Sequence, residues 1–191
     1  FMSSTSGRDS EPVIGKNQEE DLRLLLKDCS TYLGSYSESM VSKAFRLCAD
    51  AHKNDVRASG EPYYTHPLAV ARIVIRESRL HDVSVAAALL HDVVEDTSYS
   101  LDDIRAEFGS AVAEIVDGVT KISGIFKSAE IKQAENYRKL LLSLVKDVRV
   151  ILIKFADRLH NMRTVSFLSD EKRARMARET LEIYAPFAHR F

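Results

Sequence analysis

The chain has 191 residues, and 45% of them are hydrophobic, which is enough to build the core of one domain. Its 27 Lys and Arg nearly balance its 28 Asp and Glu, and the formal net charge of -1 disfavours a general binder of nucleic acids. The apolar stretch over residues 83–90 is far shorter than the ~20 residues of a membrane span. We therefore expect neither direct nucleic-acid binding nor a place in a membrane.

Glycine and proline are scarce, with seven and four residues, and apolar residues recur mostly at helical spacing, so the sequence predicts an all-α fold. Residues 1–17 are polar and rich in Ser, and predict a flexible arm ahead of one domain over residues 18–191. A structured loop is expected over 54–66 and a mobile loop over 124–130. Helices are expected, in chain order, over residues 19–33 and 37–53, from residue 67 onward, and over 82–96, 100–108, 110–121, 134–146, 150–165 and 170–184.

Polar residues mark where some of these helices begin. Ser37 can cap the second helix, and Ser100 with Asp103 resembles a capping box. Residues 150–153 (Val-Ile-Leu-Ile) could also form a strand, but no turn residue interrupts the pattern through Thr164. The length of this segment therefore favours a helix.

The two cysteines indicate a reducing compartment. Cys29 and Cys48 lie in helix-like apolar patterns and not in a CxxC pair, which excludes a zinc site of that type. We therefore expect two buried thiols in a cytoplasmic protein.

His91 and Asp92 follow directly after an apolar run at residues 86–90. A buried helix does not continue into charged groups unless they have partners, because an unpaired buried charge is costly. A divalent cation is one such partner, since it holds imidazole and carboxylate in their ligating forms. On a continuous helix, Glu95 and Asp96 lie one turn further along the same two stripes. These acids could instead merely end the helix, although acidic groups there oppose the macrodipole.

Two distant residues complete a candidate donor set. Pro67 suits the first position of a helix, which places His66 at that helix's N-terminal edge, and Asp157 lies inside another apolar helical segment. Two imidazoles and two carboxylates suit Mn, Fe, Zn or Mg, and leave positions open for water and a phosphate oxygen. In the alternative interpretation His66 is structural, and Asp157 pairs with a neighbouring base: Lys154, Arg158 or Arg163.

Charge is uneven along the chain. Residues 82–117 contain nine acidic residues and only Arg105 as a base, whereas residues 138–163 contain seven bases and two acids. An acidic region that holds a metal and faces a basic region would suit a small phosphorylated substrate. The alternative is that these are solvated helix faces segregated only in sequence.

Three stretches together resemble the H…HD…D pattern of HD-domain metal-dependent phosphohydrolases: His66-Pro67, His91-Asp92-Val93-Val94-Glu95-Asp96-Thr97 and Phe155-Ala156-Asp157-Arg158-Leu159-His160-Asn161-Met162-Arg163-Thr164. Others narrow the resemblance to the hydrolase domain of the RelA/SpoT family of guanosine tetraphosphate and pentaphosphate enzymes: Ser59-Gly60-Glu61-Pro62-Tyr63, Val116-Asp117-Gly118-Val119-Thr120-Lys121 and Glu179-Thr180-Leu181-Glu182-Ile183-Tyr184-Ala185-Pro186-Phe187-Ala188-His189-Arg190. The resemblance covers roughly residues 20–191.

This resemblance implies an HD-domain helical bundle that hydrolyses the 3′-pyrophosphate of (p)ppGpp to GDP or GTP and pyrophosphate. The family's usual metal is Mn²⁺, and its ligands correspond to His66, His91, Asp92 and Asp157. The residues alone do not distinguish Mn from Fe or Zn. The acid pair that activates the attacking water corresponds to Glu95 and Asp96. The nucleotide contacts correspond to Arg57, Ser59, Tyr63, Asn161 and Thr164.

One position departs from the family pattern. The family often has Arg-Lys-Ser-Gly where this chain has Arg57-Ala58-Ser59-Gly60, a change that bears on recognition of the base and not on the metal. In long members the last helix leads into a synthetase domain, so we expect an N-terminal part of a bifunctional enzyme, with a stand-alone hydrolase as the alternative. The rival functions are an HD phosphohydrolase for another nucleotide and a catalytically silent nucleotide-sensing module.

Overall fold

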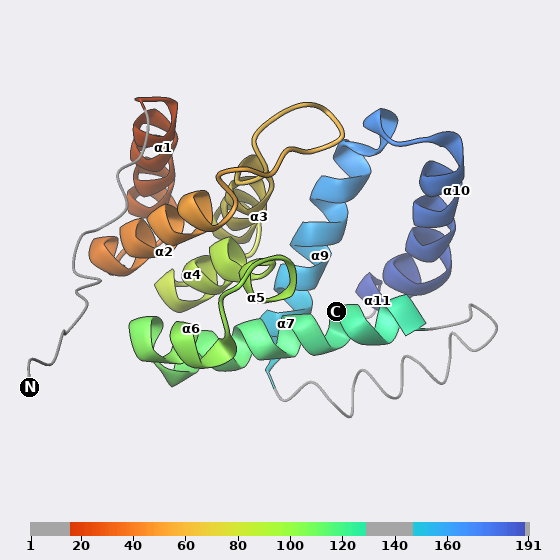
Figure 1. Ribbon diagram of the computed structural model, residues 1–191. Coiled ribbons are helices and arrows are strands. Elements are labelled where there is room, and N and C mark those ends of the chain that lie inside the picture. Colours follow the sequence, from red (N-terminus) through yellow and green to blue (C-terminus); the bar gives the residue numbers. More distant parts are fainter. Residues whose placement is uncertain (1–15, 129–146, 190–191) are drawn as a thin grey trace, which may run out of the picture.

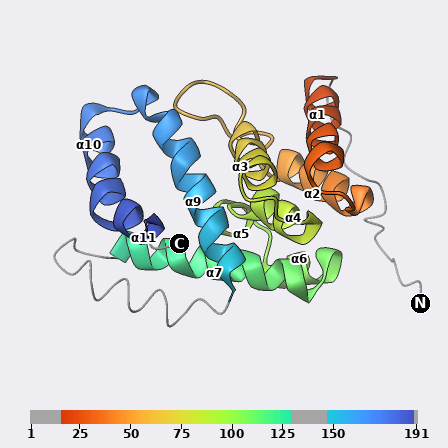
Figure 2. The same ribbon diagram turned by 180° about the vertical axis from the view of Figure 1, so that it is seen from behind.

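The computed structural model describes residues 16–128 and 147–189, and every regular element within these ranges is a helix (Figures 1 and 2). The all-α prediction is therefore confirmed. The arm predicted over residues 1–17 falls almost entirely outside the described residues, and the helix predicted over 134–146 falls wholly outside them. The elements are α1 (Lys16–Tyr32), α2 (Glu38–Ala51), α3 (Thr65–Arg76), α4 (Asp82–Leu90), α5 (Val93–Asp96), α6 (Leu101–Phe108), α7 (Ser110–Ser128), α9 (Val148–Arg163), the 3₁₀ turn η2 (Val165–Phe167), α10 (Asp170–Glu179), the π turn η3 (Thr180–Tyr184) and α11 (Ala185–Ala188).

Helix α4 forms the centre of the fold because it is apolar on all sides. Residues 85–90 have no exposed surface, and the helix packs against α2, α3 and α7. A helix that is apolar on all sides is most stable when other helices surround it, because this removes the most apolar surface from water. Helix α9 packs on α3 and α7 and lies between α3 and α10 in both views (Figures 1 and 2). The C-terminal end of α4 therefore comes close to α3 and α9.

The caps and thiols agree with the predictions. The side chain of Ser37 accepts a hydrogen bond from the backbone N–H of Met40, and Ser100 and Asp103 form the expected capping box. Cys29 and Cys48 are both buried free thiols. Burial raises the pKa of Cys29 to about 12, so this thiol stays protonated and unreactive.

The helix predicted over residues 82–96 is wrong in one respect, because it is broken at His91 and Asp92. Helix α4 ends at Leu90, and the short helix α5 begins at Val93. The Nδ1 atom of His91 lies 2.7 Å from the carbonyl oxygen of Ala88, which is within hydrogen-bonding distance. A side chain that bonds the carbonyl of the preceding turn competes with the helical hydrogen-bond pattern, and the chain turns at this point.

Helix α7 is longer than predicted and packs closely against α9. It continues to Ser128, so the expected loop over 124–130 is wrong for its first five residues. Gly118 permits a close approach between the two helices: a Cβ atom there would lie 2.7 Å from Cγ2 and 3.2 Å from Cγ1 of Val150.

The predicted helix over 170–184 changes its winding at Thr180. Helix α10 ends at Glu179, and the π turn η3 carries the chain to Tyr184, whose ring is buried. The Arg158 guanidinium lies 4.1 Å from the centre of that ring. Short π segments often occur beside functional sites, and this one lines the cavity described below.

Candidate metal centre and the cavity beside it

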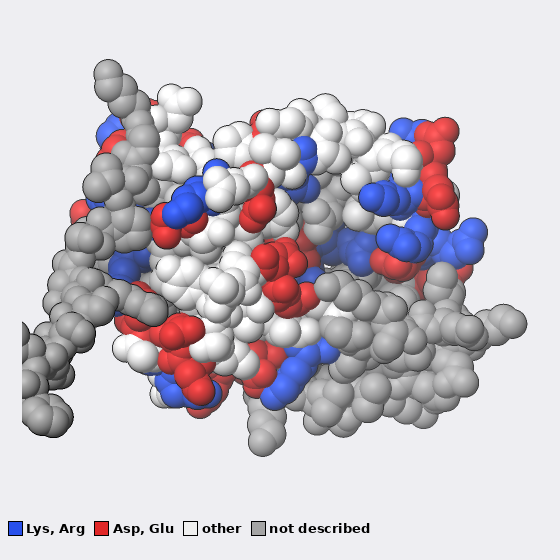
Figure 3. Space-filling view, viewed as in Figure 1, with Lys and Arg blue, Asp and Glu red and all other residues white. Residues whose placement is uncertain are grey.

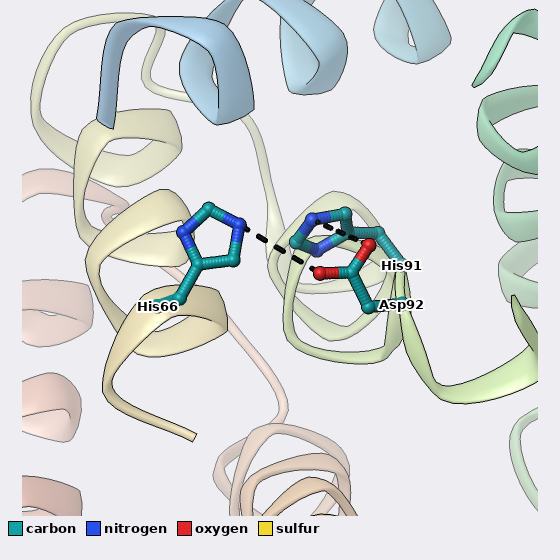
Figure 4. A group of neighbouring side chains, drawn as sticks. All are labelled: His66, His91 and Asp92. Atoms are coloured by element: carbon teal, nitrogen blue, oxygen red, sulfur yellow. Dashed lines mark ion pairs between the residues drawn. The ribbon is translucent and has the colours of Figure 1, made fainter. Parts of the chain in front are cut away.

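Two histidines and an aspartate meet where α3 approaches the break between α4 and α5 (Figure 4). The Nε2 atom of His66 lies 3.7 Å from Oδ2 of Asp92, and Nε2 of His91 lies 3.3 Å from Oδ1 of the same carboxylate. Each residue offers one donor atom, and all three lie within 4.8 Å of one another. Both histidines are almost fully buried, so this cluster is enclosed by the fold and is not a chance surface grouping.

Helix α9 adds Asp157 to the cluster. Its Oδ1 atom lies 3.2 Å from Nε2 of His66 and 4.0 Å from Nε2 of His91. The four residues expected to form one donor set, scattered over the sequence, therefore lie together in space.

The hydrogen bonds of His91 show that its ring suits a cation. The carbonyl oxygen of Ala88 can only accept, so Nδ1 of His91 carries a proton, and in the neutral ring the lone pair is on Nε2. This buried Nε2 has no hydrogen-bond partner in the described part of the chain, and it faces the carboxylates of Asp92 and Asp157. A lone pair among carboxylates is unfavourable without a positive charge between them. The donor set therefore fits a divalent metal ion.

The carboxylate of Asp157 divides its two oxygens between the histidines and a buried lysine. Lys154 Nζ lies 2.6 Å from Oδ2 and also bonds Ser123 Oγ, while the amide of Asn161 donates to Oδ1. Burial alone would raise the pKa of Asp157, but Lys154 and the two histidines hold it well below its usual range. The pairing with Lys154 that we considered as an alternative thus coexists with the approach to the histidines.

His66 has a second imidazole as its neighbour. Its Nδ1 atom lies 2.7 Å from Nδ1 of His160, a residue of α9 that the sequence analysis did not single out. Burial lowers the pKa of His66, and burial together with the nearby His66 and Arg57 lowers the pKa of His160 to about 4.

Tyr63 connects the cluster to the expected acid pair. Its hydroxyl lies 2.9 Å from Oδ2 of Asp92 and 3.2 Å from Oδ2 of Asp96, and it can donate to either oxygen. Burial and the negative charge of Asp92 raise the pKa of Asp96, although the bond from Tyr63 acts in the opposite direction. Glu95 and Asp96 both lie on α5 and line the same cavity as Asp92.

A cavity of about 760 Å³ opens beside the cluster and contains every residue expected to contact a nucleotide. Arg57 donates through Nη2 to Oδ1 of Asn161 at 3.3 Å and to Oγ1 of Thr164 at 3.2 Å. The loop between α2 and α3 thereby reaches across to α9. Ser59 and Ala58 lie on the wall of the cavity beside Arg57.

Beyond Arg57, four basic side chains line the cavity and form its basic wall, and half of them lie in the basic region noted in the sequence. Lys154 and Arg158 come from α9, and Lys172 and Arg175 come from α10. In Figure 3, acidic atoms near the centre of the visible face are followed toward α10 by a group of Lys and Arg atoms. The basic pair on α10 stands at i, i+3, a spacing that would have indicated one charged face.

The chain matches the family model described as HD domain over residues 44–191. The chain belongs to the HD domain family. The matched range includes all four residues of the candidate donor set, and metal-dependent hydrolysis is the chemistry of this family. No helix in the described part of this HD-domain chain is long and apolar enough to cross a lipid bilayer.

Curated relatives of this HD-domain chain are named after guanosine polyphosphates. A guanosine-3′,5′-bis(diphosphate) 3′-pyrophosphohydrolase of Haemophilus influenzae is 53% identical over 145 residues, which cover 75% of this chain and 21% of the relative. The bifunctional (p)ppGpp synthase/hydrolase SpoT of Escherichia coli K12 is 50% identical over 161 residues, which cover 84% of this chain and 23% of the relative. The chain thus spans less than a quarter of the length of either relative.

A solved structure supports the same relationship at the level of the fold. This metazoan ortholog of SpoT, which hydrolyses ppGpp, has a TM-score of 0.62 and 26% identity, and the match covers 78% of this chain and 85% of the other. Together with the relatives, it confirms the resemblance to the RelA/SpoT family that the motifs indicated.

Proposed function

We propose that this chain hydrolyses the 3′-pyrophosphate of ppGpp and pppGpp, releasing pyrophosphate and GDP or GTP. The observation that carries the proposal is the convergence of His66, His91, Asp92 and Asp157 at the edge of a cavity that basic side chains also line. The names of the relatives support the choice of guanosine polyphosphates over other nucleotides.

The four clustered residues would hold one divalent ion, for which we propose Mn²⁺. When bound, such an ion lowers the pKa of a water molecule and offsets negative charge that develops on phosphorus. The buried Asp157 and the partly exposed Asp92 would hold the cation together with the two histidines, and the surrounding helices keep bulk water away from most of the cluster.

Glu95 and Asp96 would handle the proton of the attacking water. Both carboxylates line the cavity, and Asp96 shares the hydroxyl of Tyr63 with Asp92. A carboxylate whose pKa is raised toward neutral pH is a better general base than an ordinary surface aspartate.

Two groups of residues that line the cavity would contact different parts of the nucleotide. Arg57, Asn161 and Thr164 form one polar wall that could hold the nucleoside, with Ser59 beside it. The residues of the basic wall could hold the phosphates, because Lys and Arg bind phosphate oxygens through charge-assisted hydrogen bonds. In this arrangement Tyr63 also orients the carboxylates of Asp92 and Asp96, in addition to the nucleotide contact that the resemblance implies.

The relatives also suggest a setting for the chain. We propose that it is the hydrolase part of a longer cytoplasmic enzyme that carries a synthetase domain, as the name of the Escherichia coli relative includes both activities.

The test is to incubate the chain with ppGpp after removal of metals and after addition of Mn²⁺, and to measure pyrophosphate. We expect release only with the metal. Release from deoxynucleoside triphosphates but not from ppGpp would favour another HD phosphohydrolase, and tight ppGpp binding with no product would favour a sensor; either outcome would overturn the proposal.

The variant Glu95→Gln separates water activation from binding. It keeps the size of the side chain and removes the negative charge, so we expect kcat to fall about 10²- to 10⁴-fold while Mn²⁺ and ppGpp still bind. Metal analysis and equilibrium binding of ppGpp provide the controls. A variant with the full rate would show that Glu95 does not handle the proton.

A further inference from the structure

His66 and His160 form a hydrogen bond in which the two atoms are chemically alike. Their Nδ1 atoms lie 2.7 Å apart, and the ring centres lie 4.9 Å apart with the planes tilted by 39°. A neutral imidazole has one N–H and one bare nitrogen, so one ring must donate and the other must accept. The geometry alone allows either direction.

The other nitrogen of His66 determines the direction when no cation is bound. Its Nε2 atom lies 3.2 Å from Oδ1 of Asp157 and 3.7 Å from Oδ2 of Asp92. Ionised carboxylates can only accept, so the proton of a neutral His66 is best placed on Nε2. Its Nδ1 atom is then bare, and His160 must be the donor.

A cation on Nε2 of His66 reverses this arrangement. With a cation bound there, the lone pair of Nε2 would be taken up, so the proton of His66 would lie on Nδ1 and be donated to a bare Nδ1 of His160. His91 differs, because its Nδ1 faces the carbonyl oxygen of Ala88, which can only accept. His91 is thus fixed in its ligating tautomer, whereas the tautomer of His66 depends on His160, which can both donate and accept a hydrogen bond.

We propose that His160 is a positioning residue of the metal centre, which holds the His66 ring in place both with and without the cation by reversing their shared hydrogen bond. The protons balance: the shared proton moves from His160 to His66, the Nε2 proton of His66 leaves to water, and Nε2 of His160 takes one from water. The pair therefore releases no net proton when the metal binds. The inference rests on the metal centre of the proposed function and not on the identity of the nucleotide.

Two variants of the chain separate hydrogen bonding from packing. His160→Phe keeps a ring but removes both nitrogens, and we expect its Mn²⁺ affinity to fall about 10- to 100-fold, as for other residues that orient a metal ligand. His160→Asn places an amide near the position of Nδ1 that can donate or accept after a flip, so its affinity should stay within about threefold of the wild type. His81→Phe, at an exposed position at the start of α4, is the control for loss of an imidazole.

Electron paramagnetic resonance of free Mn²⁺ measures these affinities, and the metal-free melting temperature checks that each variant folds. Equal affinity of His160→Phe and the wild type would overturn the proposal. So would a loss of affinity in His160→Asn as large as in His160→Phe, because packing would then explain both.

Nitrogen NMR of the wild-type chain tests the reversal directly and does not depend on any variant. With ¹⁵N-labelled histidine, we expect His160 to carry its proton on Nδ1 without metal and on Nε2 with diamagnetic Zn²⁺, while His66 changes in the opposite sense. A tautomer of His160 that stays the same on Zn²⁺ binding would overturn the proposal. Because neither readout involves a nucleotide, a failure of ppGpp hydrolysis would leave this inference standing.

Discussion

At the scale of single residues, the two carboxylate oxygens of Asp157 contact different partners. Oδ1 faces the histidines, while Oδ2 is held by Lys154. Both side chains are largely shielded from solvent, with exposed fractions of 13% for Lys154 and 8% for Asp157, so each charge has lost most of its hydration and depends on the other. The pair therefore fixes the orientation of the carboxylate as much as it neutralises it.

Removing the lysine leaves a buried carboxylate without its counter-charge. We expect Lys154→Met to lower the free energy of unfolding by about 3 kcal/mol, measured by urea denaturation at neutral pH without metal. The matched control is Lys121→Met, which breaks an ion pair of similar length with Asp117 on an exposed face and should cost less than about 0.5 kcal/mol. Equal losses in the two variants would contradict a buried, orienting pair.

The hydroxyl of Tyr63 partly opposes the raised pKa of Asp96. Burial and Asp92 raise the pKa of Asp96, and the bond from Tyr63 lowers it in part, so Tyr63→Phe should raise it further. A base is inactive below its pKa, and we therefore expect the acid side of the kcat–pH profile to move to higher pH. An unchanged inflection would exclude Asp96 as the group that limits the rate in acid.

At the scale of elements, periodicity predicted where helices occur better than where they break. The apolar run predicted a buried central helix, and α4 is that helix. The argument that placed His91 with Glu95 on one stripe assumed an unbroken helix, so its local geometry was wrong, although Glu95 still lines the same cavity as Asp92. The break depends on the bond between the His91 side chain and the carbonyl of Ala88, a contact that apolar spacing does not encode.

The contact between α7 and α9 at Gly118 gives a prediction about packing. A methyl group there meets both methyls of Val150, a short buried side chain that cannot move aside, so Gly118→Ala should cost about 1–3 kcal/mol despite the better helix propensity of Ala. In a Val150→Ala background the same change should become neutral or stabilising. Chemical denaturation of the four members of this double-mutant cycle measures the coupling, and additive effects would contradict the predicted clash.

At the scale of the whole molecule, the metal centre joins helices that are distant in the sequence. Its donors come from α3, from the turn between α4 and α5, and from α9. The order of the motifs predicted that these residues lie close together in space. The reason is that two imidazoles and two carboxylates in apolar surroundings can all be stabilised by one divalent cation. The basic wall was predicted only in part: of the bases in residues 138–163, Lys154 and Arg158 line the cavity, whereas Arg149 pairs with Asp147. A count of charges cannot tell which helix face points inward.

A cation that joins these helices should stabilise the whole fold. At a Mn²⁺ concentration of about 100 times Kd, we expect the free energy of unfolding to rise by about 2.7 kcal/mol, seen as a higher melting temperature that a chelator reverses. Asp92→Asn keeps the shape of the side chain and should lose most of this gain. An equal rise in that variant would mean that the ion binds elsewhere.

The spread of the donors along the chain has a consequence for biosynthesis. As the polypeptide leaves the ribosome, His66, His91 and Asp92 emerge well before Asp157, the last of the four. A nascent chain therefore lacks the complete set of proposed metal ligands until α9 has been made and has docked on its neighbours. Binding of the ion should accordingly coincide with the final steps of tertiary folding, so the newly made protein takes up the metal only after its helices have packed together.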